Sequence, residues 1–430
     1  MIPIIYASTP EGEAKIDTIL KRSQLEYGNV QEIVDGILAD VKKNGDKALF
    51  EYTEKFDGLK LTADTVRVTE DEIKAAYTKV DPELLRVIRR SAARIRAFHE
   101  KQKRNSFIEP AFNGETLGQL IRPLERVGVY VPGGKAAYPS SVLMNIMPAK
   151  VAGVSEIYMV TPAKADGTVY PTTIVAAVEA GADVIYKIGG AQAVAALAFG
   201  TESVKKVDKI CGPGNIFVAL AKKSVYGHVN IDSVAGPSEI LVIADESANP
   251  VYAAADLLSQ AEHDELASAI LITSSEKLAK EVQKEVEIQS AKLERKAIID
   301  KSIEKFGAVI IVKTVEEACE LANFIAPEHL EVCTESPYEA LNLIKNAGAV
   351  FLGNYSPEPL GDYMAGPNHV LPTGRTARFF SPLSVDDFIK KTSVIHFTKN
   401  ALGSLGDDII KFAEAEGLTA HANSVRVRKS

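Results

Sequence analysis

Through most of residues 1–110, apolar residues recur at helical spacing and polar residues fill the positions between them. This pattern predicts a series of amphipathic helices. The helical pattern of residues 29–56 is expected to break at Asn44–Gly45, a turn-forming pair. A further helix is expected to begin at Asp81–Pro82, because aspartate is a favoured N-cap and proline is tolerated in the first helical turn.

A different pattern begins near residue 118, where short β-branched runs alternate with alanine-rich stretches. A first series continues to about residue 237. A second starts with an expected strand at 238–245, a helix at 249–263 and a strand at 267–275. Apolar strands that alternate with helices indicate βαβ units on a parallel sheet. We therefore expect two α/β lobes, followed beyond about residue 382 by a helical, polar appendage.

Composition narrows the class of protein. The 430 residues are 46% hydrophobic and 25% charged, with a net charge of −8, which argues against nucleic acid or an anionic membrane as the main partner. No apolar run approaches the length of a membrane span, and the N-terminus lacks the features of a signal peptide. The 3 cysteines form no CxxC pair and suit a reducing compartment. We expect a cytoplasmic protein.

Glycine-proline turns mark possible ligand sites. In CGPGN (211–215), Gly212 and Gly214 fit the start of a dinucleotide loop, but Phe217 occupies the third glycine position. A nucleotide-binding turn and a plain tight turn both remain open. Cys211 has apolar neighbours and no adjacent histidine, so we interpret it as a buried structural cysteine.

Several polar residues could carry chemistry. Gln260 and His263 are three residues apart near a helix end, where both could reach one metal ion or form only the polar end of the helix. Glu328–His329 precede an expected strand and could supply a general base and a water activator, or be a solvated acid beside a half-buried imidazole. Asp362 and His369 fall in an expected loop, where a turn around Asp362 is the simpler interpretation.

Eight blocks occur in an order that resembles the histidinol dehydrogenase family over roughly residues 30–425. The blocks are RVGVYVPGG, GGAQAVAALAFGTESV, VDKICGPGN, AGPSEILVIAD, DLLSQAEHD, PEHLEV, GDYMAGPNHVLPT and EGLTAH. The resemblance implies two incomplete Rossmann-like lobes with parallel sheets and helical N- and C-terminal extensions. The expected division is an N-terminal extension at 1–25, a discontinuous catalytic lobe at 26–125 and 238–381, an NAD-binding lobe at 126–237, and a C-terminal extension at 382–430.

The resemblance also implies an activity. L-histidinol would be oxidised to L-histidine in the last step of histidine biosynthesis, through histidinaldehyde that stays bound. Two NAD molecules would be reduced in succession, and one Zn²⁺ would be required in each active site. A homodimer is implied, in which the C-terminal extension completes the active site of the other subunit.

Matching the blocks position by position assigns roles to individual residues. Glu328 and His329 match the catalytic acid–base pair. The matched zinc ligands are Gln260, His263, Asp362 and His421. The matched NAD contacts are Tyr130, Gln192 and Asn215. The matched substrate contacts are Ser238, Gln260, His263, His329, Asp362, His369, Glu416 and His421.

Three other functions compete with this one. A related zinc- and NAD-dependent dehydrogenase could act on another small alcohol, although Ser238, His369 and Glu416 match the residues that hold histidinol. A zinc hydrolase could use Glu328 to activate water without a redox step. A non-catalytic metal-binding protein would have no use for the Glu328–His329 pair.

Overall fold

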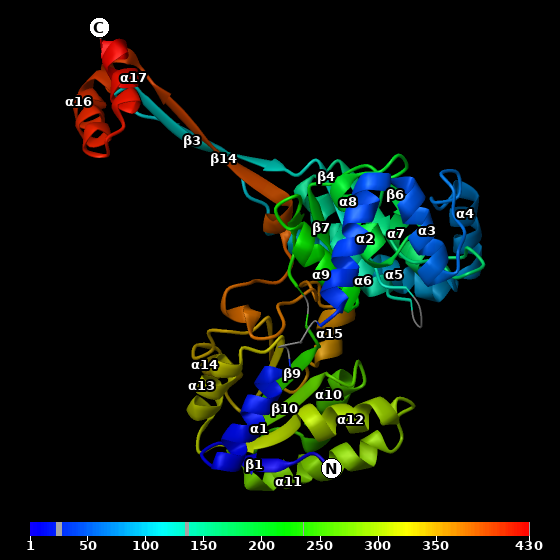
Figure 1. The fold of residues 1–430 in the computed structure, drawn as a ribbon. Coiled ribbons are helices and arrows are strands. Elements are labelled where there is room, and N and C mark those ends of the chain that lie inside the picture. Colours follow the sequence, from blue (N-terminus) through cyan, green and yellow to red (C-terminus); the bar gives the residue numbers. More distant parts are fainter. Residues whose placement is uncertain (23–27, 134–136, 235, 430) are drawn as a thin grey trace.

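The computed structural model describes residues 1–22, 28–133, 137–234 and 236–429. It has two α/β lobes and a long arm (Figure 1). We call residues 30–100 with 126–231 the upper lobe, residues 4–21 with 239–363 the lower lobe, and residues 107–123 with 389–429 the arm. Within the described residues, no helix combines the length and the apolar character that crossing a lipid bilayer demands.

The upper lobe is built on a parallel sheet of five strands in the order β6-β5-β4-β7-β8. In sequence order this is 3-2-1-4-5, the Rossmann order without its sixth strand. The strands are β4 (Arg126–Tyr130), β5 (Glu156–Val160), β6 (Val184–Tyr186), β7 (Lys209–Cys211) and β8 (Asn230–Ile231), and the helices between them are α6 (Pro139–Ala152), α7 (Pro171–Ala180), α8 (Gly190–Phe199) and α9 (Ile216–Val225).

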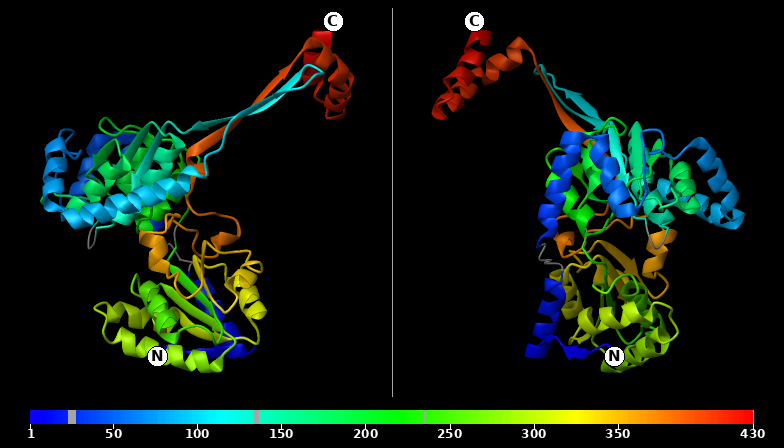
Figure 2. Two further views of the ribbon diagram at one scale, coloured as in Figure 1. Left: turned by 180° about the vertical axis from the view of Figure 1, so that it is seen from behind. Right: turned by 45° about the vertical axis from the view of Figure 1, so that its right-hand side comes forward.

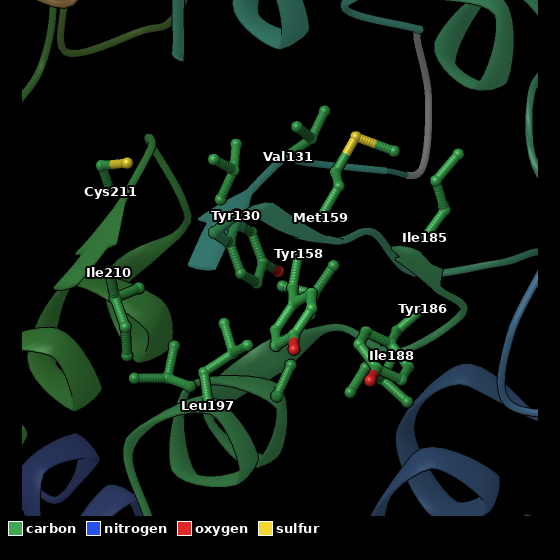
Figure 3. Close-up of a cluster of buried hydrophobic side chains, with 14 of the residues drawn as sticks. Tyr130, Val131, Tyr158, Met159, Ile185, Tyr186, Ile188, Leu197, Ile210 and Cys211 are labelled. Carbon is green, nitrogen blue, oxygen red and sulfur yellow. The ribbon is translucent and has the colours of Figure 1, made fainter. Parts of the chain in front are cut away.

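The core of the upper lobe forms where strand side chains meet these helices. Figure 3 shows Tyr158 and Tyr186 from neighbouring strands, with Leu197 of α8 close to them. The two tyrosine rings pack edge to face, with centroids 6.0 Å apart. Helix α6 is buried on nearly all sides, which agrees with its lack of a polar face.

The N-terminal helices cover the upper lobe, which corrects the expected division of the chain. Residues 26–125 were expected to join residues 238–381, but Val34, Ile37 and Val41 belong to the upper core. Helix α2 packs against α8 and α9, α4 against α7, and α5 against α6 and α7. The helices are α2 (Val30–Asn44), α3 (Asp46–Asp57), α4 (Glu70–Lys79) and α5 (Pro82–Glu100), with the expected break at Asn44–Gly45 and the expected Asp81 cap.

The lower lobe repeats the same strand order. Its parallel sheet has the order β1-β11-β10-β9-β12-β13. Counted from β9 to β13 along the chain, five of these strands have the order 3-2-1-4-5, and β1 is added at one edge. The strands are β1 (Ile4–Tyr6), β9 (Glu239–Ala244), β10 (Ser268–Thr273), β11 (Gly307–Ile311), β12 (His329–Cys333) and β13 (Ala349–Leu352). The expectation of two incomplete Rossmann-like lobes is confirmed.

Helices cover both faces of the lower sheet. Ile240 and Val242 point to one face and Leu241 and Ile243 to the other, so β9 is apolar after its first residue, Glu239, as a central parallel strand should be. The helices are α1 (Pro10–Lys21), α10 (Pro250–Ala261), α11 (Glu276–Ser290), α12 (Lys296–Phe306), α13 (Val315–Ile325), α14 (Pro337–Leu341) and α15 (Glu358–Tyr363). The N-terminal segment is thus part of the lower lobe, and its expected border at residues 25–26 lies outside the described residues.

The arm joins segments far apart in the chain. Strand β3 (Glu115–Pro123) pairs antiparallel with β14 (Ile389–Phe397) and with β2 (Phe107–Pro110). The ribbon projects from the upper lobe and carries α16 (Lys399–Ala415) and α17 (Thr419–Lys429) at its tip, as Figures 1 and 2 show. The C-terminal extension was expected to be helical, and its helices are present, but they follow a nine-residue strand.

Candidate active site

A cavity of about 710 Å³ lies between the lobes and gathers most of the predicted site residues. From the upper lobe, the cavity is lined by residues that follow the carboxyl ends of β4 and β7, such as Pro132 and Gly212. From the lower lobe, it is lined by residues at the amino ends of β9 and β12. The lower-lobe residues in the lining are Ser238, Gln260, His263, Glu328, His329, Glu358, Asp362 and His369. We call this cavity the cleft.

The backbone around His329 fixes the orientation and the tautomer of its imidazole. It is the first residue of β12 and is 5% exposed. Its Nδ1 lies 2.9 Å from the backbone oxygen of Glu239. Because a carbonyl oxygen only accepts hydrogen bonds, Nδ1 carries the proton and Nε2 the lone pair. Burial lowers the pKa of His329 to about 4, so the ring is neutral at pH 7. Nε2 has no hydrogen-bond partner among the described residues and is free to accept a proton.

Glu328 is also buried, so the solvated acid that its local sequence allowed is not what the structure shows. Its Oε2 accepts a hydrogen bond from the backbone N–H of Glu239 at 2.9 Å. Burial, together with the negative charge of Glu239, raises the pKa of Glu328 well above its usual value. A carboxyl with a raised pKa is suited to exchange protons near neutral pH.

Glu239 organises both members of this pair. Its carboxylate accepts hydrogen bonds from the backbone N–H of Glu328 at 3.1 Å and of Gly374 at 2.9 Å. Arg22, just after α1, balances the charge, with Nη2 2.6 Å from Oε1 of Glu239. Both side chains are almost fully buried. The N-terminal segment therefore supports the active site through one arginine, which local sequence patterns gave no reason to suspect.

Replacing Arg22 with methionine is expected to destabilise the lower lobe by about 3–5 kcal/mol, because it leaves the buried Glu239 carboxylate without its cation. Urea unfolding of the purified variant measures the effect. Lys21→Met is the matched control, since the ion pair of Lys21 with Asp17 is exposed and should be worth at most about 1 kcal/mol. Equal losses in the two variants would contradict the role of Arg22.

The cleft contains a group of side chains with the donors that a metal ion requires. Donor atoms of His329, Glu358 and Asp362 all lie within 4.8 Å of one another. Oε1 of Gln260 is buried without a hydrogen-bond partner among the described residues. Nδ1 of His263 donates to the backbone oxygen of Ser259 at 2.9 Å, which leaves Nε2 as a possible ligand. Imidazole, carboxylate and carbonyl oxygen are donors that zinc accepts.

Asp362 lies on α15 and not in the loop that its sequence suggested. Its Oδ1 is 3.3 Å from Nδ1 of His369. Burial alone would raise the pKa of Asp362, but the hydrogen bond with His369 and the attraction of His369 and His329 hold the pKa of this carboxyl below its usual value. Asp362 is thus kept ionised, as a metal ligand must be.

Glu358 is the cleft residue that the sequence interpretation missed. It is 2% exposed, and burial together with the charge of Asp362 raises its pKa to about 9. Its Oε1 lies 3.7 Å from Nε2 of His329. The available signal was its spacing, because Glu358 and Asp362 are four residues apart and share a helix face.

A second cavity of about 470 Å³ gathers the predicted NAD contacts Tyr130, Gln192 and Asn215. The hydroxyl of Tyr130 accepts a hydrogen bond from the backbone N–H of Gly190 at 3.0 Å. Oε1 of Gln192 is buried and has no partner among the described residues. Asn215 caps α9 with its side-chain oxygen. Pro132 lines this cavity as well as the cleft, so the two are neighbours.

Two predicted residues are outside both cavities. Glu416 and His421 are exposed near the tip of the arm, away from the lobes of their own chain (Figure 1). Cys211, in contrast, is fully buried, and burial raises the pKa of its thiol far above the ordinary value. The interpretation of Cys211 as a structural cysteine is confirmed.

Two Rossmann-like sheets, a buried imidazole in the cleft and an adjoining cavity define an α/β fold with a candidate enzyme site. The sequence profile of histidinol dehydrogenase matches residues 20–429. The chain is 60% identical over 410 residues to histidinol dehydrogenase of Caldanaerobacter subterraneus, with 95% of each chain covered. It is 56% identical over 428 residues to that of Clostridium acetobutylicum, with 100% of this chain and 99% of the relative covered.

A solved structure agrees with these relatives. The crystal structure of histidinol dehydrogenase from Elizabethkingia anophelis has a TM-score of 0.94 at 40% identity, covering 99% of this chain and 98% of that one. The chain belongs to the histidinol dehydrogenase family and is an oxidoreductase.

Proposed function

We propose that the protein oxidises L-histidinol to L-histidine through bound histidinaldehyde, with NAD as oxidant and Zn²⁺ in the site, as the last step of cytoplasmic histidine biosynthesis. The observation that carries this proposal is the buried His329, whose unpartnered Nε2 belongs to the same cleft as a set of metal-type donors. Family membership supports the choice of histidinol as substrate.

Gln260, His263 and Asp362 would hold Zn²⁺, with His421 of a second copy as the fourth ligand. The unpartnered oxygen of Gln260, the oriented imidazole of His263 and the ionised Asp362 fit such an ion. Zinc, when bound, orients the imidazole and amine of the substrate. The side chain of Glu358 interacts with that of Asp362 and would hold the Asp362 carboxylate in position.

Tyr130, Gln192 and Asn215 would hold NAD in the second cavity. The unpartnered Oε1 of Gln192 supports this, because it could accept a hydrogen bond from an amino or a hydroxyl group of the nucleotide. NAD, when bound, accepts hydride from the carbinol carbon in each oxidation. The shared lining residue Pro132 shows that the cavity is next to the cleft, so one NAD molecule could reach both.

The chain's own residues would then move the protons. Nε2 of His329 accepts the hydroxyl proton of histidinol in the first oxidation. Glu328 takes a proton from the water that adds to the aldehyde. After it has released the first proton to solvent, His329 accepts a second hydroxyl proton, from the hydrated aldehyde, in the second oxidation. Ser238 and His369, with Glu416 of the other subunit, would hold the substrate, and burial of the site keeps the reactive aldehyde from bulk water.

A homodimer would complete the site. The arm projects away from the lobes of its own chain (Figure 2) and carries Glu416 and His421 in its C-terminal part. Phe412, Leu418 and Ile395 are exposed on it. An arm that projects into solvent with exposed apolar side chains is consistent with contact to a second copy of the chain. Asp362 and His369 also line a neighbouring cavity of about 900 Å³, which we propose as the place where the tip of the partner's arm would enter.

Counting product tests the proposal. Purified protein given limiting L-histidinol and excess NAD is expected to form about two NADH per histidinol, because each oxidation step transfers one hydride. Removal of metal with a chelator is expected to abolish turnover, and added Zn²⁺ to restore it. One NADH per histidinol would indicate a simple alcohol dehydrogenase, and none with zinc fully loaded would overturn the proposal.

A further inference from the structure

We infer that Asp57 hydrogen-bonds the hydroxyls of the adenosine ribose and makes the enzyme select NAD over NADP. The inference rests on the proposed use of NAD and adds a residue that neither the motifs nor the family resemblance singled out. Asp57 is the last residue of α3 and lines the second cavity beside Tyr130 and Gln192.

The position of the cavity determines which half of NAD lies there. The nicotinamide has to meet the substrate, so it belongs at the cleft, where His329 lies. The adenosine half is left for the second cavity, which is next to the cleft and shares the lining residue Pro132 with it. A volume of about 470 Å³ is within the range of pockets that hold ligands of this kind.

The carboxylate of Asp57 has an oxygen without a hydrogen-bond donor among the described residues, and a ribose hydroxyl could be that donor. Its Oδ2 is buried and makes no hydrogen bond within the part of the chain that the structure describes. Burial also raises the pKa of Asp57. A buried carboxylate oxygen without a donor is costly, and the adjacent 2′- and 3′-hydroxyls of ribose are two donors suited to one carboxylate.

The topology of the upper lobe explains why this residue comes from a helix. In Rossmann lobes an acidic side chain beyond the glycine-rich turn commonly binds the ribose hydroxyls. Here β5, the second strand, is followed by Thr161-Pro162-Ala163-Lys164, which contains no acid. Helix α3 packs on α8 and brings Asp57 to the cavity instead.

The charged residues of the second cavity favour NAD over NADP. Among the described residues that line the cavity, Asp57 is the one acid and Lys164 the one base. The ammonium of Lys164 lies 4.4 Å from the ring centroid of Tyr170, and the residue is exposed. A 2′-phosphate would place negative charge beside the carboxylate of Asp57, which is unfavourable at close range.

Binding of NADH and NADPH to the zinc-loaded, full-length protein tests the inference by calorimetry, without turnover. The wild-type protein is expected to bind NADH at least about tenfold more tightly than NADPH, because hydrogen bonds to a charged group discriminate by this order. Asp57→Asn and Asp57→Ser are expected to weaken NADH binding and to reduce that ratio at least about tenfold. Glu54→Gln, an exposed acid on the same helix, should leave the ratio unchanged.

The outcomes separate this inference from the proposed function. If the wild-type protein binds NADH but both Asp57 variants keep its NADH-to-NADPH ratio, Asp57 does not read the ribose. Equal binding of the two nucleotides by the wild-type protein, as expected if Lys164 receives a 2′-phosphate, also overturns the inference. If the wild-type protein binds neither nucleotide and forms no NADH from histidinol, the proposed function itself is wrong.

Discussion

His329→Asn is expected to lower kcat by about 10²- to 10⁴-fold, the usual contribution of a general base. The asparagine amide can still donate to the Glu239 carbonyl, as Nδ1 of His329 does at 2.9 Å, so the backbone around the site should be retained. What is lost is Nε2, the unpartnered nitrogen in the cleft. Zinc content, which does not depend on this base, should stay at the wild-type level. Steady-state kinetics and metal analysis of the same preparation give both values.

His228→Asn serves as the control for that substitution, because His228 is exposed and lines none of the cavities described above. It should have wild-type kcat. A fully active His329→Asn protein would show that another group takes the alcohol proton. A variant that had lost its zinc would instead place His329 among the metal ligands, with Glu358 and Asp362 as the companions that the geometry allows.

Mixed dimers of Glu328→Gln and His421→Ala chains are expected to recover activity that neither variant has alone. If the arm of one subunit completes the site of the other, a mixed dimer has one site with both defects and one site with none. Random exchange of subunits then gives roughly a quarter of the wild-type activity. Turnover of L-histidinol after co-expression, or after refolding from an equimolar mixture, measures this recovery.

The same experiment tests the position of His421. If His421 served its own chain, each mixed dimer would contain only defective sites, and no activity would return. His396→Ala in place of His421→Ala is the matched control, because His396 is also exposed on the arm but lies on β14 and not at the tip.

Local patterns were sufficient for most of the elements. The break at Asn44–Gly45, the Asp81 cap and the strands 239–244 and 268–273 all follow from capping, turn propensity and apolar runs. The alternation of strands and helices likewise predicted two parallel sheets. These features depend on residues close in sequence, which is why the chain alone reveals them.

Long-range packing was beyond those patterns. The apolar face of α2 shows that the helix is buried but not which sheet it covers, so residues 26–125 were placed with the wrong lobe. Similarly, β14 pairs with a strand over 260 residues earlier, and its sequence lacks the strong alternation of apolar and polar residues that would predict a strand.

The candidate site divides in the same way. Glu328, His329 and Gln260 were assigned roles because eight sequence blocks occur in the order of the family. The local sequence around each of them also allowed an ordinary structural role. Arg22 and Glu358 were missed, because their importance lies in a buried ion pair with Glu239 and in the approach to Asp362, and neither contact is visible along the chain. Burial is what distinguishes them from the many exposed charges.

The arm also sets an order for folding during synthesis. Strand β3 leaves the ribosome long before β14, its partner over nine residue pairs, and β1 likewise waits for β11. Most of the upper lobe is made from residues 30–231 and can form while the rest is still being translated, and Leu383 and Phe388 join its core later. Until these partners emerge, β1 lacks β11 and β3 is paired with β2 along one edge alone, so the nascent chain exposes one free strand and one free strand edge for most of its synthesis.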